Sequence, residues 1–222
     1  MTHESATLPT RPAYAYVLGD ALYLNLTSAC TLACTFCPKI RDDNWVVGGV
    51  DLKLARPPTA EEVWAQVAEA GLSGRPEVVF TGLGEPTRRL EVLLETARRL
   101  KAAGVARVRL DTDGLASLRE GRDVPGLLAE AGLDAVVVSL NAADPATYAR
   151  LCPNRYGEAA WQAARQFIRA SLGRIAEVQA SFVAVPGLDE GACRREAEAL
   201  GAVFRWRPYD RVGRLRELGG NA

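Results

Sequence analysis

The chain has 222 residues, which is enough for one substantial domain with a buried core or for two small ones. Its 27 Lys and Arg residues balance its 27 Asp and Glu residues, so the composition carries no strong nucleic-acid or membrane signal. The first twenty residues lack the basic and apolar segments of a secretory signal, and no apolar run approaches the ~20 residues of a membrane helix. We therefore expect a cytoplasmic protein, in which five cysteines are too few to form a secreted disulfide scaffold.

No Gly-, Ser- or Pro-rich linker divides the sequence, which predicts one domain over residues 1–222. Residues 1–20 are expected to be a loose or accessory segment, and residues 210–222 a disordered tail. Between them, six short runs rich in β-branched and aromatic residues predict buried parallel strands. These runs are Ala21–Thr27, Glu77–Gly82, Arg107–Thr112, Ala135–Asn141, Val178–Val185 and Ala202–Tyr209.

Amphipathic helices with recognisable ends alternate with these strands. Thr59 and Glu62 form a capping-box pattern that opens a helix over Ala60–Ala70, and Gly71 closes it. Further helices are expected from Pro86 to Gly104, over Val124–Ala131, from Pro145 after the cap Asp144, from Trp161 to Leu172, and from Asp189 to Leu200.

Six strand–helix units predict right-handed crossovers and a parallel sheet. They are fewer than the eight of a full TIM barrel, which typically needs ~250 residues. An open, partial (β/α)6 TIM-like barrel fits the length, and a doubly wound flat sheet is the alternative that periodicity alone leaves open. In both architectures the functional residues collect at the carboxyl ends of the strands.

Three cysteines follow the first predicted strand at the spacing CxxxCxxC: Cys30, Cys34 and Cys37. Thiolates are soft ligands that favour iron–sulfur clusters, zinc or copper(I). A closed zinc site needs a fourth ligand, for which the candidates are Cys152, Cys193 and the only histidine, His3, all distant in sequence. Cys34 and Cys37 also form the CxxC of a redox pair, but that interpretation leaves Cys30 unexplained. A 4Fe–4S cluster usually takes four cysteines, so three would leave one iron open to an exchangeable ligand.

This motif, with Phe36 before its last cysteine and six βα units around it, resembles the radical S-adenosylmethionine (SAM) superfamily. The resemblance implies that Cys30, Cys34 and Cys37 bind a 4Fe–4S cluster whose fourth iron is chelated by SAM. It further implies that reductive cleavage of SAM yields a 5′-deoxyadenosyl radical, which abstracts hydrogen from a substrate. A reductant such as flavodoxin or ferredoxin is an expected partner.

The rest of the resemblance lies at the ends of later strands. In "GLGEP", the residues Gly82, Gly84 and Glu85 match the glycine-rich element whose backbone holds the amino group of SAM in the family. Carboxylates in "LDTDG", Asp111 and Asp113, are candidates for a ribose or a substrate, although an Asp-Gly turn explains them equally well. By resemblance, Ser139 and Asn141 contact the ribose and carboxylate of SAM, and Val185 and Arg207 lie near its adenine.

Other polar and thiol residues stay undecided at this stage. Arg155 either pairs with a carboxylate of SAM or substrate or is a solvated loop residue. Cys152 and Cys193 are expected to be small buried residues, and Asp42 and Asp43 either form a solvated turn or face the site. The longer segments "TSACTLACTFCP" and "LNAADPATYARLCPNRYG" resemble small radical SAM proteins associated with TatD-family nucleases. The substrate is unknown, with a peptide, a protein or a nucleotide-derived molecule expected; a non-catalytic, cluster-bearing partner of a nuclease is the rival interpretation.

Overall fold

A computed structural model describes residues 11–209 of the chain, so the tail expected at 210–222 lies outside the described residues. Its main feature is a seven-stranded sheet in the order β1-β2-β5-β6-β7-β8-β9. The strands are β1 (Ala15–Leu18), β2 (Ala21–Leu24), β5 (Val78–Phe80), β6 (Val108–Thr112), β7 (Ala135–Ser139), β8 (Glu177–Val183) and β9 (Val203–Arg207). Each of the six predicted strands is therefore present, in every case slightly shorter than its apolar run.

The order of the strands decides between the two architectures that the sequence allowed. From β2 to β9 all neighbours are parallel, and they follow one another in chain order. In a doubly wound sheet the order of the strands along the chain reverses at the middle of the sheet. Strands that follow one another in chain order from edge to edge are instead typical of a barrel wall. Because β1 and β9 are the two edges and do not pair, the barrel is partial and open.

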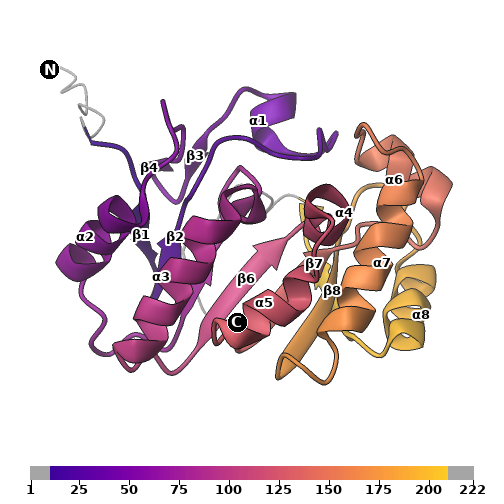
Figure 1. The fold of residues 1–222 in the computed structure, drawn as a ribbon. Coiled ribbons are helices and arrows are strands. Elements are labelled where there is room, and N and C mark those ends of the chain that lie inside the picture. Colours follow the sequence, from indigo (N-terminus) through magenta and orange to yellow (C-terminus); the bar gives the residue numbers. More distant parts are fainter. Residues whose placement is uncertain (1–10, 210–222) are drawn as a thin grey trace, which may run out of the picture.

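The helices lie along one face of this sheet, as Figure 1 shows. They are α2 (Ala60–Ala70), the 3₁₀ turn η1 (Pro86–Arg89) that leads into α3 (Leu90–Ala102), α4 (Ala116–Glu120), α5 (Val124–Glu130), α6 (Pro145–Leu151), α7 (Ala159–Ser171) and α8 (Glu190–Leu200). Helix α2 has the predicted bounds and the predicted capping box, with the Thr59 side chain accepting from the Glu62 N–H. None of the described helices is both long and apolar enough to span a membrane.

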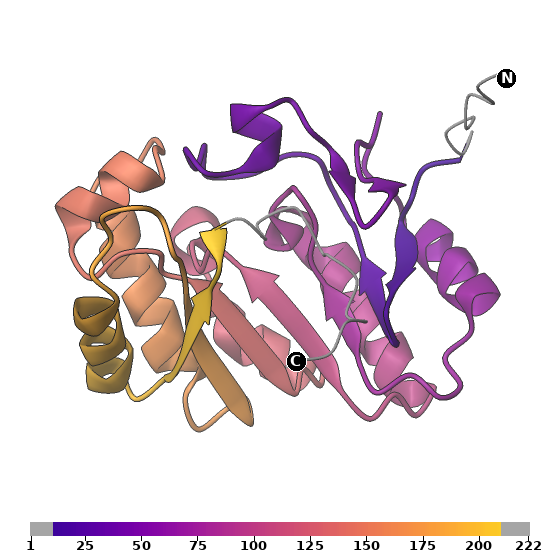
Figure 2. The ribbon, with the colours of Figure 1, turned by 180° about the vertical axis from the view of Figure 1, so that it is seen from behind.

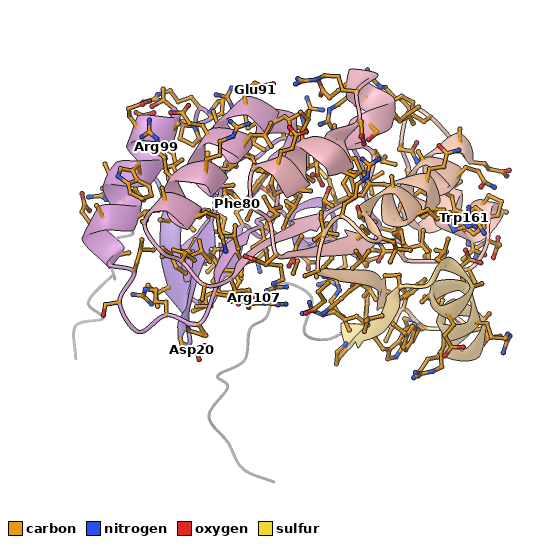
Figure 3. All side chains as sticks on the ribbon, turned by 60° about the horizontal axis from the view of Figure 1, so that its bottom comes forward. Asp20, Phe80, Glu91, Arg99, Arg107 and Trp161 are labelled. Atoms are coloured by element: carbon orange, nitrogen blue, oxygen red, sulfur yellow. The ribbon has the colours of Figure 1, made fainter. Side chains whose placement is uncertain are left out.

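Alternation along each strand sends one set of side chains into the layer between sheet and helices. Phe80 of β5 and Phe182 of β8 point into this layer and are fully buried. The charged Glu91 and Arg99 lie instead on the outer side of α3 (Figure 3). The opposite, concave face of the sheet is crossed by none of the described helices (Figure 2).

Strand β1 is an addition that was not predicted, since residues 1–20 were expected to be loose or accessory. It pairs antiparallel with β2, with Leu18 opposite Ala21, so Gly19 and Asp20 form a two-residue hairpin connection. Gly19 has a φ of 60°, the left-handed conformation that such a tight turn favours. The chain elsewhere adds a small two-stranded ribbon, β3 (Val46–Val47) and β4 (Val50–Asp51), after the short helix α1 (Pro38–Arg41).

Candidate active site

The three cysteines lie on the loop between β2 and α1, above the carboxyl ends of the strands (Figure 1). All three are half-buried and free. The Cys37 N–H donates to the Cys34 carbonyl over 3.0 Å, and the Cys37 carbonyl accepts from the Arg41 N–H over 2.9 Å. Cys37 is therefore the residue at which α1 begins, and Pro38 suits the first position of that helix.

Burial disfavours the charged, thiolate form of Cys30 and Cys37. It raises the pKa of Cys30 to about 12, with the nearby carboxylates of Glu85 and Asp113 as further causes. Burial also raises the pKa of Cys37. Ligation to iron needs thiolates, so loading a cluster here would release protons from the loop.

Cys34 faces another cysteine directly. The Ala33 N–H donates to the Pro153 carbonyl over 2.8 Å, and the Thr35 N–H donates to the Leu151 carbonyl over 2.9 Å. These two bonds join the cysteine loop to the end of α6 and place Cys34 opposite Cys152. A hydrogen bond between the two thiols, and then burial, raises the pKa of Cys34.

The glycine-rich turn after β5 packs against the start of the cysteine loop. The Glu85 N–H donates to the Ala29 carbonyl over 2.9 Å, which joins the two segments. A Cβ on Gly84 would lie 1.9 Å from the Thr27 carbonyl oxygen, so only glycine fits there. Gly82 has a φ of 150°, which also favours glycine. Gly84 is thus required by the approach of the two backbones, and Gly82 by its own backbone conformation and the Asn25 side chain beside it.

The side chain of Glu85 is occupied by the protein itself. Its Oε1 accepts from the hydroxyls of Thr87 (2.6 Å) and Thr112 (2.8 Å), and its Oε2 accepts from the Asp113 N–H over 2.7 Å. The carboxylate is only 3% exposed. Glu85 therefore fixes the end of β6 to the turn after β5, and what the turn leaves for a ligand is its backbone.

Asp113 and Asp111, which the sequence grouped together, point to different places. Asp113 is buried, and its Oδ1 accepts from the Leu115 N–H, while its Oδ2 has no partner among the described residues. Burial, and then the charge of Glu85, raise the pKa of Asp113. Asp111 lies on the concave face of the sheet and accepts from Arg109 over 2.8 Å.

The end of β7 holds the second predicted pair. Asn141 is 1% exposed and has a φ of 56°, a conformation uncommon for a residue other than glycine. Its N–H donates to the Ser181 carbonyl, and its side-chain amide nitrogen lies 3.5 Å from the Cys152 sulfur and 3.3 Å from the Ser139 carbonyl. Its Oδ1 has no partner among the described residues. Strained backbone of this kind collects at ligand sites.

Arg207 ends β9, and its backbone carbonyl accepts from the Ala184 N–H over 2.9 Å. Its Nε is buried without a partner among the described residues, and its charge acts on Cys34. Val185 follows the end of β8 and is half-buried beside the core. The two predicted strand ends therefore meet, with Arg207 directed towards the cysteine loop.

Together these contacts leave a group of buried polar atoms around the cysteines with nothing to bind. Tyr148 lies within electrostatic reach of Cys152, Asp113, Cys34 and Cys30, and its hydroxyl is unpartnered in the described part of the chain. The group comprises Asp113 Oδ2, Asn141 Oδ1, Tyr148 OH, Ser181 Oγ and Arg207 Nε. Buried polar groups are normally hydrogen-bonded, so such a concentration fits a polar ligand with amino, carboxylate and hydroxyl groups. SAM has this chemistry.

The ligand sets of a single metal ion and of a 4Fe–4S cluster differ in how closely their side chains converge. Among residues 11–209, no three His, Cys, Asp or Glu side chains converge as the ligands of one metal ion. In a 4Fe–4S cluster each thiolate binds a different iron, so its cysteines surround a larger volume. Of the three candidates for a fourth zinc ligand, Cys152 lies beside Cys34, Cys193 is fully buried on α8, and His3 lies outside the described residues.

The remaining candidates lie away from this space. Phe36 is 5% exposed and belongs to the hydrophobic core. Arg155 is exposed and donates to the Tyr156 hydroxyl over 2.6 Å. Asp43 accepts from the Trp45 ring nitrogen over 2.9 Å, and Cys193 is fully buried on α8. Asp42 accepts from Arg41 on the exposed loop after α1.

Two members of the site were not predicted from the sequence. Tyr148 and Ser181 read as an ordinary helix residue and an ordinary strand residue, and only the fold brings them beside the cysteines. Cys152 was expected to be a buried residue without a role. No local pattern in "LCPNRYG" indicates that its backbone pairs with the cysteine loop.

Comparison with known proteins agrees with this geometry. The model of the Radical SAM superfamily matches residues 24–198, and the chain belongs to this superfamily. Its members use a 4Fe–4S cluster and SAM.

Two curated relatives illustrate its range. GTP 3′,8-cyclase of Mycolicibacterium smegmatis is 34% identical over 132 residues, which cover 59% of this chain and 33% of the relative. A probable dual-specificity RNA methyltransferase, RlmN 1 of Opitutus terrae, is 31% identical over 188 residues, which cover 79% of this chain and 48% of the relative. The chain thus spans half or less of the length of these relatives.

Solved structures share the fold at lower identity. A radical SAM methyltransferase from Sphaerobacter thermophilus superposes with a TM-score of 0.58 at 22% identity, covering 87% of this chain and 57% of that one. Methylornithine synthase superposes with a TM-score of 0.59 at 15% identity, covering 85% of this chain and 53% of that one. Both support the partial barrel.

Proposed function

We propose that this protein is a radical SAM enzyme in which Cys30, Cys34 and Cys37 bind a 4Fe–4S cluster with one iron left for SAM. The observation that carries the proposal is the group of unpartnered buried polar atoms beside three free thiols. Neither a structural zinc site nor a dithiol redox pair requires such a group, because both are complete with their sulfur ligands or partners.

Within this site the role proposed for the chain's own residues is to bind and orient SAM. The backbone of the Gly82–Glu85 turn would hold the amino group of SAM, and Asn141, Ser139 and Asp113 would receive its ribose and carboxylate. Arg207 supplies a positive charge next to Cys34. The cofactor supplies the homolytic chemistry: reductive cleavage of SAM to methionine and a 5′-deoxyadenosyl radical that abstracts hydrogen. The protein's part is to position the two reactants and to exclude water.

The reaction downstream of hydrogen abstraction is a separate proposal. The names of two curated relatives refer to GTP and to RNA, which favours a nucleotide-derived substrate over a peptide or protein. We place the chain nearest the small radical SAM proteins associated with TatD-family nucleases, on the sequence segments quoted above. A low-potential reductant, flavodoxin or ferredoxin, and a reducing cytoplasm suit a site built from free thiols.

The proposal is tested by anaerobic reconstitution with iron and sulfide, followed by dithionite and SAM. We expect a brown protein with about four irons per chain, by the stoichiometry of the cluster, and 5′-deoxyadenosine detected by mass spectrometry. Cys34→Ala should lose the visible absorbance and the product. Cys193→Ala is the matched control, because Cys193 is a buried cysteine on α8 outside the cysteine loop and should keep both.

The rival function, a cluster-bearing or zinc-bearing module that only binds a nuclease, predicts another result. Stoichiometric zinc in the isolated protein, together with no 5′-deoxyadenosine after reconstitution, would establish it. The close approach of Gly84 to Thr27 and the unpartnered Asn141 and Asp113 oxygens speak against it, since metal stabilisation alone does not need them.

A further inference from the structure

A cavity of about 190 Å³ lies on the concave face of the sheet, on the side that no described helix covers (Figure 2). Its position next to the Gly82 turn makes it the space adjoining the proposed SAM site. Six of the residues that line it carry the following argument: Tyr16, Tyr23, Gly82, Arg109, Asp111 and Arg205.

Strand register explains why charged side chains gather here. Arg109 and Asp111 are two residues apart on β6, and Arg205 and Arg207 are two residues apart on β9, so each pair shares one face. Arg205 lies beside Ser181 and Arg207 beside Val183 of β8. The positive charges of β9 therefore point to the interior of the open barrel, at two successive heights.

The arginine of β6 has carboxylate partners within hydrogen-bond distance, whereas the two arginines of β9 have none among the described residues. The Arg109 side chain is 9% exposed and is satisfied by Asp111 (2.8 Å) and Glu77 (3.2 Å). Arg205 has one long contact, to the neutral Gln179 oxygen at 3.5 Å. Neither Arg205 nor Arg207 has a carboxylate within 4.0 Å in the described part of the chain.

The carboxylate of Asp111 acts on both Arg205 and Arg207 from beyond the distance of an ion pair, and it is already bonded to Arg109. Three guanidinium groups that share so few carboxylates leave an excess of positive charge on this face, and such an excess is costly where water is partly excluded. An anion bound by Arg205 in the cavity would offset this excess of positive charge, and arginine binds carboxylate or phosphate through two parallel hydrogen bonds.

The opposite wall of the cavity is aromatic. Tyr16 and Tyr23 face each other across the β1–β2 hairpin, with ring centroids 5.6 Å apart and an interplanar angle of 24°. Such rings offer a flat surface for another ring. An aromatic wall and an arginine whose one direct hydrogen-bond partner among the described residues is neutral are complementary to a ring that carries an acidic group.

We propose that this cavity binds the substrate, which carries an anionic oxygen group held by Arg205 and a planar ring held against Tyr23. The anionic group is a phosphate or a carboxylate, both of which suit the guanidinium. This inference rests on the proposed function, because a substrate in the cavity would lie beside the Gly82 turn, where SAM is proposed to bind. Phosphate and carboxylate ligands are distinguished by the probes below.

The test is calorimetric titration, under anaerobic conditions, of the reconstituted protein with SAM. The probes are guanosine 5′-monophosphate for phosphate and 4-hydroxyphenylacetate for carboxylate, each against its uncharged counterpart, guanosine and 4-hydroxyphenylacetamide. We expect one anion to bind at least about tenfold more tightly than its neutral counterpart, as for a charge-assisted hydrogen-bond pair. Equal affinity within both pairs would overturn the inference.

Variants locate the effect. Arg205→Gln should remove the preference for the anion and Arg205→Lys should retain part of it, while Arg195→Gln, on the exposed side of α8, should leave it unchanged. An anion preference that survives in Arg205→Gln contradicts the assignment. If Arg205→Gln does not fold, Arg205→Lys and the charged-versus-neutral comparison on the unmodified protein decide. Iron content and 5′-deoxyadenosine are measured on the same preparations. A protein that cleaves SAM but binds neither anion would refute the inference about the cavity and leave the proposed function standing.

Discussion

Gly84 is the residue on which contact between the glycine-rich turn and the cysteine loop depends. The side chain of any other residue would overlap the Thr27 carbonyl group, which is backbone and cannot rotate away. The same turn contributes Glu85, whose carboxylate holds the Asp113 backbone. A local change here is therefore expected to disturb three segments of the site together.

Gly84→Ala should lower the free energy of unfolding by about 1–3 kcal/mol or more, the usual cost of overpacking. Urea denaturation measures it. Gly191→Ala is the control, because Gly191 lies in the first turn of α8 and a Cβ there would meet only side-chain atoms, at 3.2 Å or more. A midpoint for Gly84→Ala equal to that of Gly191→Ala would contradict the close approach.

Cys34 and Cys152 are placed to form a disulfide when no cluster is bound. Two backbone hydrogen bonds flank the pair, and the two thiols are within hydrogen-bond reach of each other. With oxidised glutathione, the two thiols would become one disulfide and two glutathione thiols would be released. Because the pKa of Cys34 is raised, its thiolate fraction and hence the rate should keep increasing above pH 9.0, the ordinary pKa of a cysteine.

Peptide mapping without reduction identifies the linked pair. We expect Cys34–Cys152 in the cluster-free protein, none in Cys152→Ser, and none in the reconstituted protein, where Cys34 is occupied. Linkage of Cys34 to Cys30 or Cys37 instead would show that the pairing is not maintained in solution.

The short motifs of the site were predictable from the sequence, whereas the contacts between residues far apart in the sequence were not. The cysteine loop and "GLGEP" are short motifs whose spacing is visible in the chain. Contacts such as Cys34 with Cys152, or Asn141 with Ser181, join residues far apart in sequence, so they follow only from the sheet order. The separation of Asp111 from Asp113 depends on which face of β6 each side chain takes near the end of the strand.

Helix α2 shows how an element's boundaries follow from its end residues. Thr59 accepts from the Glu62 N–H, the Glu62 carboxylate accepts from the Thr59 N–H, and Arg56 binds the same carboxylate. This reciprocal arrangement is why the predicted and observed bounds of α2 agree. Strand β1 was missed although its hairpin signal, a Gly-Asp pair between apolar runs, was present in the sequence.

The capping carboxylate should make α2 sensitive to acid. The ion pair with Arg56, and then the Thr59 N–H, lower the pKa of Glu62 to about 2 from an ordinary 4.5. A lowered pKa stabilises the fold above the ordinary value, and this contribution is lost as the pH falls from 4.5 towards 2. Glu62→Gln should therefore lower the thermal midpoint at neutral pH, with a difference from the unmodified protein that shrinks below pH 4.5.

Circular dichroism melts at a series of pH values measure this effect. Glu198→Gln on α8 is the control, since Glu198 is exposed and forms no ion pair within residues 11–209. A Glu62→Gln difference that stays constant from neutral pH down to about pH 3, well inside the titration range of a carboxylate, would contradict the lowered pKa.

On the scale of the whole molecule, the fold is a barrel wall that stops short of closure. Its strands follow in chain order from β2 to β9, and helices cover one face (Figures 1 and 2). The cavity with Arg205 lies on the concave face. The number and type of units were predictable because each strand and helix has its own periodicity. The sheet order, which excludes the doubly wound alternative, was not, because it depends on pairings between distant segments.

The central claim is that three cysteines hold a cluster with one iron reserved for SAM. Electron paramagnetic resonance of the dithionite-reduced, reconstituted protein, recorded with and without SAM, tests it most directly. We predict a 4Fe–4S signal that changes on addition of SAM and is absent in Cys34→Ala. A signal that SAM leaves unchanged, or a reconstituted protein without any iron–sulfur signal, would contradict the account.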